Sequence, residues 1–290
     1  MQRRSLGSNA GRLQSRPWPG QHFLRNRTVT AWMVRRGRVG ASDLVWDIGA
    51  GDGALSVPLA QVASQVVAVE GDRTLAERLR ARVAMLDNVS VVEQDFLTLR
   101  LPIRDFLVVA NLPFAITTPV FRRLVDPRAF MVRAVLLVER GAARRFTECP
   151  SANPELIAWH TWFDIRWERN VARTSFVPPP GVDAAALVIE RRRLPELRPH
   201  SVESYRAFLD HVLQDPPQPM RHALRGVFTP EQMMRALRAL AVPRDAPAGT
   251  LTPRLWTLLY LIMRQHADPS KWPRARIRRG RGRTRPSRVR

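Results

Sequence analysis

The chain has 290 residues, 45% of them hydrophobic, which is enough for one large domain and a smaller one with a sizeable core. Its formal net charge of +22 indicates a polyanionic partner, most often nucleic acid. Its single cysteine, Cys149, excludes an intramolecular disulfide and a cysteine-based metal cluster and fits a reducing, cytoplasmic location. No apolar run reaches the roughly 18 residues of a membrane span, so we expect no membrane association.

The positive charge is concentrated at the two ends. Residues 1–20 contain four arginines, and residues 271–290 contain nine arginines and Lys271; neither segment has an acidic residue. We therefore predict a disordered basic N-terminal arm over 1–20 and an Arg-rich disordered tail over 271–290, either to bind a polyanion or to aid solubility. The acid-free N-terminus also resembles a mitochondrial transit peptide.

Apolar runs of strand length alternate with helical periodicity along residues 21–195. The pattern predicts helices at 26–36, 55–62, 74–86 and from about 117, and strands at 44–48, 65–70, 89–92, 106–110, 134–138, 159–167 and 184–191. This alternation predicts the α/β class, with a doubly wound parallel sheet in which the last pair of strands allows one antiparallel edge strand.

The sequence changes character after about residue 193. Helical periodicity recurs at 202–213, 230–240 and 253–265, separated by proline-rich joints. We predict a small all-helical C-terminal domain over 196–270, following the α/β domain of 21–195.

Unusual residues follow four of the predicted strands, where ligands of doubly wound folds bind. The first set is Asp47–Gly53 (DIGAGDG), whose G-x-G-x-G spacing departs from the G-x-G-x-x-G of dinucleotide sites. Glu70 can accept hydrogen bonds from ribose hydroxyls, and Asp95 from an adenine amine. A glycine turn with these acceptors and no pyrophosphate clamp favours S-adenosylmethionine as cofactor, although a tight strand-to-helix turn alone would also explain the glycines.

The fourth strand end reads ANLPFAITTP, residues 110–119. The Asn111 side-chain carbonyl and the Leu112 main-chain carbonyl can accept hydrogen bonds from an exocyclic base amine while the amine nitrogen attacks a methyl sulfonium. Pro113 fixes the turn and has no amide hydrogen to donate. Phe114 offers a flat face on which a base flipped out of RNA can stack. The segment therefore predicts a site for methylating a base amine.

This segment resembles the N-[IL]-P-[FY]-x-I-[ST]-[ST] signature of the rRNA adenine N6-methyltransferase family. Residues 21–24 (QHFL) resemble the family's Q-[NH]-F-L, 47–53 its E-I-G-x-G-x-G with Asp47 replacing Glu, and 176–183 its F-x-P-x-P-x-V-D. The motifs follow the family order over residues 21–265. The resemblance implies a Rossmann-like class I methyltransferase fold, S-adenosylmethionine as methyl donor, a catalytic domain over 21–195 and an RNA-binding role for 196–270.

The resemblance also implies roles for individual residues. Cofactor contacts carry over to Gln21, His22, Leu24, Asp47, Gly49, Gly51, Gly53, Glu70, Asp95 and Asn111. Catalytic contacts carry over to Asn111, Leu112, Pro113 and Phe114, with Phe176 as the second stacking face of the base pocket.

The family has two main branches. The Erm type methylates a 23S rRNA adenine in the peptidyl-transferase region and confers macrolide–lincosamide–streptogramin B resistance, whereas the KsgA type dimethylates two adjacent 16S rRNA adenines. KsgA-type sequences usually read K-x-x-G-Q-N-F-L and carry Tyr at the Phe114 position. This chain has neither that Lys nor that Asn, and its tail resembles those of actinomycete Erm proteins, so we predict an Erm-type monomer acting on 23S rRNA. The alternative that is not an enzyme is a related protein that binds RNA without catalysing methylation.

Other candidate residues receive no function. Trp159, Trp162 and Trp167 could stack on RNA, but buried strand aromatics are the favoured interpretation. Arg144 and Arg145 are either phosphate contacts or a solvated face. The histidines show no metal-ligand spacing, so we predict no metal.

Overall fold

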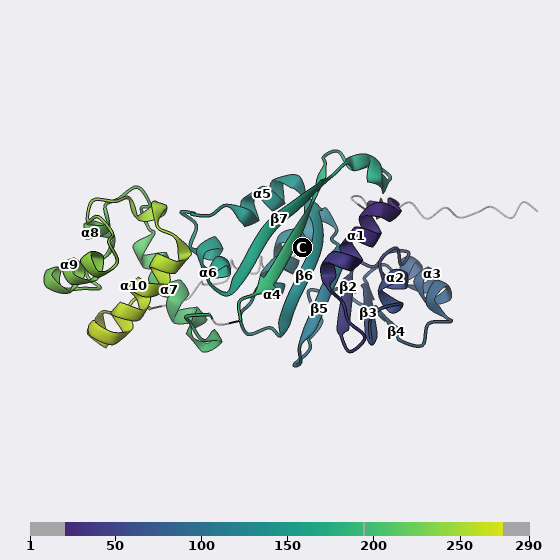
Figure 1. The fold of residues 1–290 in the computed structure, drawn as a ribbon, viewed down its shortest axis with the longest axis horizontal. Helices are drawn as coiled ribbons and strands as arrows, with labels where there is room; N and C mark the ends of the chain where they lie inside the picture. Colours follow the sequence, from purple (N-terminus) through teal and green to yellow (C-terminus); the bar gives the residue numbers. More distant parts are fainter. Residues whose placement is uncertain (1–20, 194, 275–290) are drawn as a thin grey trace, which may run out of the picture.

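The computed structural model describes residues 21–193 and 195–274. The predicted arm over 1–20 and residues 275–290 of the predicted tail lie outside the described residues. The first residues of that tail are ordered, because Lys271 ends the 3-10 helix η5 (Pro269–Lys271) and Trp272 packs against the core. A seven-stranded, mainly parallel sheet occupies the middle of the molecule (Figure 1). Its strands, in spatial order, are β4 (Val89–Glu93), β3 (Gln65–Glu70), β2 (Leu44–Ile48), β5 (Phe106–Asn111), β6 (Met131–Glu139), β9 (Ala184–Arg191) and β7 (Phe163–Val171).

The central strands are buried on both faces because helices cover both. The five residues 106–110 of β5 are all buried, with alternate side chains entering two different core clusters. One face packs against α1 (Arg27–Gly37), α2 (Ser56–Ala60) and α3 (Arg73–Val83), and the other against α4 (Thr117–Leu124), α5 (Arg140–Thr147) and α6 (Pro154–Trp162). This arrangement confirms the doubly wound α/β prediction.

The sequence pattern allowed an antiparallel strand at one edge of the sheet, but in the structure the antiparallel strand lies inside the sheet. β9 lies between β6 and β7 and is antiparallel to both, so the edge strand β7 runs parallel to β6. The first six residues of β9 are apolar and buried, which suits an interior strand. β7 alternates buried and polar residues, which suits an edge that faces solvent.

The predicted strand at 159–167 was wrong over its first part. Residues 154–162 form α6, and the strand β7 begins at Phe163. Every residue of α6 from Leu156 to Trp162 is buried, so the helix shows no amphipathic period by which it could be distinguished from a strand. The local signal was its N-terminus, where the Asn153 side chain accepts a hydrogen bond from Glu155 N (2.9 Å) and Pro154 occupies the first turn.

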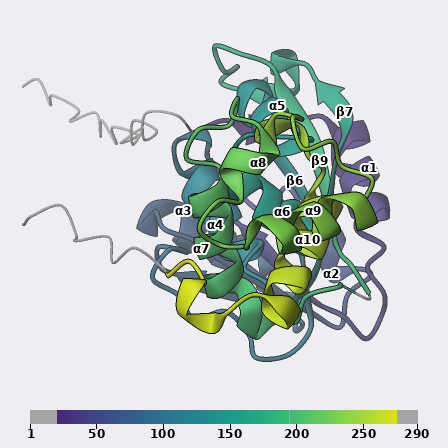
Figure 2. The ribbon, with the colours of Figure 1, turned by 90° about the vertical axis from the view of Figure 1, so that its left-hand side faces the viewer.

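The C-terminal region is helical, as predicted, and packs beside α6 at the end of the sheet (Figures 1 and 2). It contains α7 (Val202–Val212), α8 (Met220–Ala223), α9 (Pro230–Ala239) and α10 (Pro253–His266). Trp162 of α6 meets Tyr205 of α7 edge-to-face at 5.6 Å, and Tyr205 meets Tyr260 of α10 at 5.2 Å. Because one core cluster runs from the sheet into these helices, the proposed boundary at 195/196 stays a prediction.

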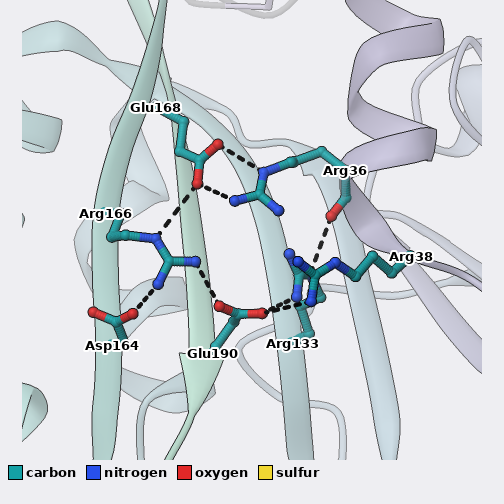
Figure 3. Close-up of polar contacts among 7 residues, drawn as sticks. All are labelled: Arg36, Arg38, Arg133, Asp164, Arg166, Glu168 and Glu190. Carbon is teal, nitrogen blue, oxygen red and sulfur yellow. Dashed lines mark hydrogen bonds and ion pairs between the residues drawn. The ribbon is translucent and has the colours of Figure 1, made fainter.

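Seven charged side chains join α1 to the strands β6, β9 and β7 (Figure 3). Arg36, at the end of α1, pairs with Glu168, and Arg133 pairs with Glu190 although only 8% of the Arg133 side chain is exposed. Arg166 of β7 connects the two pairs through Glu168 and Glu190, and it also pairs with Asp164. The network, completed by Arg38, holds α1 against the sheet.

No described helix is long and apolar enough to cross a bilayer.

Candidate active site

The glycine turn and the NLPF turn lie against each other. They follow the neighbouring parallel strands β2 and β5, which pair at Trp46 and Val108. Gly49 has a φ of +71°, and a Cβ built there would lie 2.9 Å from Pro113 Cδ. A side chain at residue 49 would therefore push the two turns apart, so glycine is required both for its backbone conformation and for this contact.

A cavity opens between the two turns. Its walls include eleven of the residues predicted from the sequence: Gln21, His22, Leu24, Asp47, Gly49, Gly51, Glu70, Asn111, Leu112, Pro113 and Phe114.

Glu70 holds the glycine turn in place. Its carboxylate accepts hydrogen bonds from Gly51 N (2.8 Å) and Asp72 N (2.9 Å), and its side chain is almost entirely buried. Each carboxylate oxygen keeps a second lone pair, so Glu70 can still accept from a ligand hydroxyl. The residue thus shapes the turn and also lines the cavity.

Asp47 lies beneath the turn, 1% exposed, and accepts a hydrogen bond from Ser56 Oγ (2.6 Å). Burial raises the pKa of Asp47 to about 7, and the Ser56 hydrogen bond offsets part of that shift. A cationic ligand in the cavity would favour the ionised form of this carboxyl group.

The amide nitrogen of Asn111 has a hydrogen-bond partner, whereas its amide oxygen has none among the described residues. Its Nδ2 donates to the main-chain carbonyl of His22 (2.9 Å), and the Leu112 N–H donates to Leu137 O (3.0 Å). Asn111 Oδ1 is buried and has no hydrogen-bond partner among the described residues. A buried acceptor without a donor is costly unless a ligand satisfies it. The site is therefore prepared for a hydrogen-bond donor such as an amine.

The QHFL segment forms one wall of the cavity. β1 (Phe23–Leu24) pairs with β8 (Phe176–Val177), which fixes the segment over the cavity. The His22 ring lies 5.7 Å from the half-buried Phe114 ring, and His22 Nδ1 lies 2.9 Å from the Pro178 carbonyl oxygen. His22 thereby links the NLPF turn to the loop that follows β8.

Three predicted residues do not line the cavity. Phe176 is 1% exposed and belongs to the core cluster beneath β1, so it presents no free ring face in this arrangement. Asp95 is exposed and accepts a hydrogen bond from Leu97 N (2.9 Å) in a turn. Gly53 has a φ of +83°, and a Cβ there would meet Leu79 at 2.7 Å, so it is needed for packing against α3.

Six further residues line the cavity without having been predicted: Phe23, Ala50, Asp52, Ala54, Leu55 and Leu75. A Cβ at Gly51 would lie 3.2 Å from the Phe23 ring, which places that ring against the glycine turn. Phe23 and Asp52 lie within motifs recognisable in the sequence, whereas Leu75 reaches the cavity from α3 and had no local signal.

The remaining candidates fall elsewhere. Trp159 and Trp162 are buried on α6, not on a strand, and Trp167 is half-buried on β7. Arg144 and Arg145 are exposed on α5. Within residues 21–193 and 195–274, no group of three or more His, Cys, Asp and Glu residues is placed to hold a metal ion.

Comparisons with known proteins agree with this geometry. A family model for ribosomal RNA adenine dimethylase matches residues 12–265. The chain belongs to this family. An rRNA adenine N-6-methyltransferase of Bacillus licheniformis is 35% identical over 94% of this chain and 96% of its own. The mycinamicin-resistance protein MyrB of Micromonospora griseorubida is 33% identical over 85% of this chain and 78% of its own.

The crystal structure of the 23S rRNA methyltransferase ErmE superposes with a TM-score of 0.74 at 25% identity, covering 84% of this chain and 100% of that one. The family and the fold make the protein an S-adenosylmethionine-dependent rRNA adenine N6-methyltransferase. The unsatisfied Asn111 Oδ1 and the glycine turn against Pro113 fit a donor and a base amine meeting in one cavity.

Proposed function

We propose that the protein transfers a methyl group to N6 of one adenine in the peptidyl-transferase region of 23S rRNA and so confers macrolide–lincosamide–streptogramin B resistance. The observation that supports the reaction is that Asn111, whose buried Oδ1 has no partner among the described residues, lines the same cavity as the glycine turn. The 23S target is supported by the likeness to ErmE and by the Phe at residue 114. Resistance is supported by the likeness to MyrB.

Bound S-adenosylmethionine supplies an electrophilic methyl group on a sulfonium. The amine of adenine is a poor nucleophile because its lone pair is delocalised into the ring. Asn111 Oδ1 and the Leu112 carbonyl would accept hydrogen bonds from the two amine hydrogens, which lets the nitrogen become pyramidal. As the nitrogen forms its bond to the methyl carbon, the bond from that carbon to sulfur breaks, and the cationic nitrogen releases one proton to water. Phe114 stacks on the everted base and fixes its direction of approach. Such orientation of well-placed groups can contribute roughly 7–11 kcal/mol to the lowering of the barrier.

The cofactor role falls to the other walls of the cavity. Glu70 accepts from the ribose hydroxyls, and the buried Asp47 carboxylate faces the cationic end of the donor. Gln21, His22 and Leu24 cover the cavity, with Gly49 and Gly51 forming its floor. Asp95 and Gly53 lie outside the cavity walls. Phe176 is buried and would have to leave the core to stack on the base. The proposed mechanism therefore does not depend on these three residues.

We assign RNA binding outside the cavity to the helical region 196–270 and to the two basic ends, in a monomer. The support for the two ends is charge: together they hold 14 of the 47 basic residues and no acidic residue.

The test is methyl transfer from labelled cofactor to two substrates, unmodified 23S rRNA and precursors of 16S rRNA. We expect incorporation into 23S rRNA, at one adenine, together with loss of macrolide susceptibility in a host that carries the gene. Incorporation into 16S precursors alone would assign the protein to the KsgA type. Failure to bind S-adenosylmethionine in a calorimetric titration would instead support a non-catalytic RNA-binding protein.

A further inference from the structure

A second, shallower depression lies near the candidate active site, on the α5 side of the sheet. We call it the Trp167 depression. Its walls come from the end of β6 and the start of α5 (Glu139, Arg140, Gly141, Arg144), from β7 (Trp167), and from the segment between β7 and β9 (Arg173, Gly181, Val182, Asp183).

Its arginines are available to a ligand. Arg140, Arg144 and Arg173 are exposed, and none of them forms a side-chain hydrogen bond or ion pair with another described residue. Arginines elsewhere, such as Arg122 and Arg128, are paired with carboxylates. Of the two acids in the walls, Asp183 uses one oxygen to accept from Arg173 N (3.0 Å). Three unpaired guanidinium groups in one depression suit phosphate groups.

Trp167 is the aromatic wall of this depression. Unlike Trp159 and Trp162, which are 5% and 1% exposed, it is half-buried. The pairing of β7 with β9 shifts register between Trp167 and Arg169, as it does at a β-bulge. Bulges near active sites often redirect a side chain, and here the bulge follows a ring that packs against the core on one side and lines the depression on the other. An indole face beside free arginines is a stacking platform for nucleic-acid bases.

The depression adjoins the cavity through shared elements. Asn111 pairs with Leu137 of β6, two residues before Glu139 in the depression. The segment after β8 contributes to both sites, because the Pro178 carbonyl contacts His22 of the cavity and Gly181 to Asp183 line the depression. A strand of RNA that delivers a base to Phe114 would therefore reach the depression with its adjacent nucleotides.

We propose that the Trp167 depression binds a nucleotide neighbouring the target adenine, with its base stacked on Trp167 and the flanking phosphates bound by Arg140, Arg144 and Arg173. The inference rests on the proposed RNA substrate and adds a second base-binding position to it. A single-stranded segment is required, since only an unpaired base exposes a face to the indole.

The test uses the full chain with a hairpin of 23S rRNA containing the target adenine. We compare Trp167→Leu, which keeps an apolar side chain against the core, with Trp167→Phe, which keeps a flat ring. Trp167→Leu is expected to raise KM for RNA about tenfold, while Trp167→Phe stays within about threefold of the parent protein. kcat and the affinity for S-adenosylmethionine are expected to change little in both variants, and melting temperatures show how much packing against the core each variant loses.

Two further measurements test whether the change in RNA binding comes from the Trp167 depression itself. Arg173→Ala should reduce the slope of log RNA affinity against log salt concentration by about 0.7 in magnitude. The matched control is Arg78→Ala, an exposed arginine on α3 at the far edge of the sheet, which should not change it. Placing 2-aminopurine at each position beside the target adenine should give quenching at one position, lost in Trp167→Leu.

Equal KM and equal quenching in Trp167→Leu and the parent protein would overturn the assignment, as would a salt dependence unchanged by Arg173→Ala. Failure of the proposed function has a different signature: the parent protein would bind S-adenosylmethionine without methylating the hairpin. In that case the quenching and salt measurements still decide whether the depression binds RNA, because neither requires turnover.

Discussion

The Asn111 side chain donates from Nδ2 to the main-chain carbonyl of His22, 89 residues earlier in the sequence, at 2.9 Å. This contact joins the end of β5 to the segment that covers the cavity. It also decides the orientation of the amide, because the nitrogen is used and Oδ1 is left as a buried acceptor without a partner among the described residues. One hydrogen bond therefore positions both the wall of the cavity and its proposed catalytic oxygen.

Replacement of Asn111 should separate catalysis from cofactor binding. In Asn111→Ala, we expect kcat to fall at least about a hundredfold because an acceptor for the amine is lost, while the Kd for S-adenosylmethionine changes only a few-fold. Asn111→Asp keeps an acceptor but cannot donate to His22 O, so its effect on cofactor affinity reports the covering segment. Single-turnover kinetics and calorimetry measure the two effects; equal losses in both would mean that Asn111 only shapes the cofactor site.

The burial of Phe176 leads to a prediction about stability. Removing a ring that is 1% exposed leaves a cavity in the core, so Phe176→Ala should lower the free energy of unfolding by about 3–5 kcal/mol. Phe114→Ala, at a half-buried ring, should cost less than half as much and raise KM for RNA instead. Urea unfolding monitored by circular dichroism measures the difference. A Phe176→Ala protein of unchanged stability would show that this ring is not a core residue in solution.

Asp47 should make both cofactor binding and stability depend on pH. Because burial raises its pKa to about 7, the folded protein holds a proton that the unfolded chain releases near pH 4. Stability from this group is therefore full below pH 4, falls as the pH rises to 7, and is constant above 7. S-adenosylmethionine carries positive charge, so its affinity should increase as the pH rises through 7 and Asp47 ionises.

The control for that prediction is Asp47→Asn, which can still accept a hydrogen bond from Ser56. It should remove the pH dependence of cofactor affinity and stabilise the protein above pH 7 by a few kcal/mol, about 4 at most. Calorimetric titrations and thermal melts between pH 5.5 and 8.5 give both quantities. A pH dependence that persists in Asp47→Asn would assign it to another group.

The charged network around Arg133 should be sensitive to the loss of one partner (Figure 3). In Glu190→Gln the buried guanidinium loses its counter-charge beside Arg166 and Arg38, so we expect a loss of about 3 kcal/mol in the free energy of unfolding. Arg133→Met should be neutral or stabilising, because it removes the buried charge itself. Glu77→Gln, which breaks the exposed Arg73–Glu77 pair, is the control and should leave the free energy of unfolding almost unchanged.

Removal of residues 271–290 should weaken RNA binding and reduce its salt dependence. The segment holds ten basic residues and no acid, and each phosphate it neutralises adds about 0.7 to 0.9 to the slope of log affinity against log salt. Filter binding at several salt concentrations measures this slope. A slope unaltered by the truncation would show that the tail does not contact RNA.

The strands and the chemistry at their ends could be predicted from the sequence. β2 and β3 have the predicted bounds, 44–48 and 65–70, because an interior parallel strand is mostly apolar on both faces and stands out from the polar and glycine residues around it. Since parallel strands align their carboxyl ends, the glycine turn, Glu70 and Asn111 were bound to lie along one edge. Their meeting at a single cavity follows from the adjacency of β2 with β3 and β5.

Long-range packing decided the rest, because it depends on contacts that no local pattern records. The burial of all sides of α6 removed the period that identifies a helix, and the apolar β9 entered the sheet between β6 and β7. Phe176 became core when β8 paired with β1, and Asp95 stayed in a turn of its own. The partial burial of Trp167, the pairing of Arg133 and the direction of the Asn111 amide are likewise set by residues dozens of positions away.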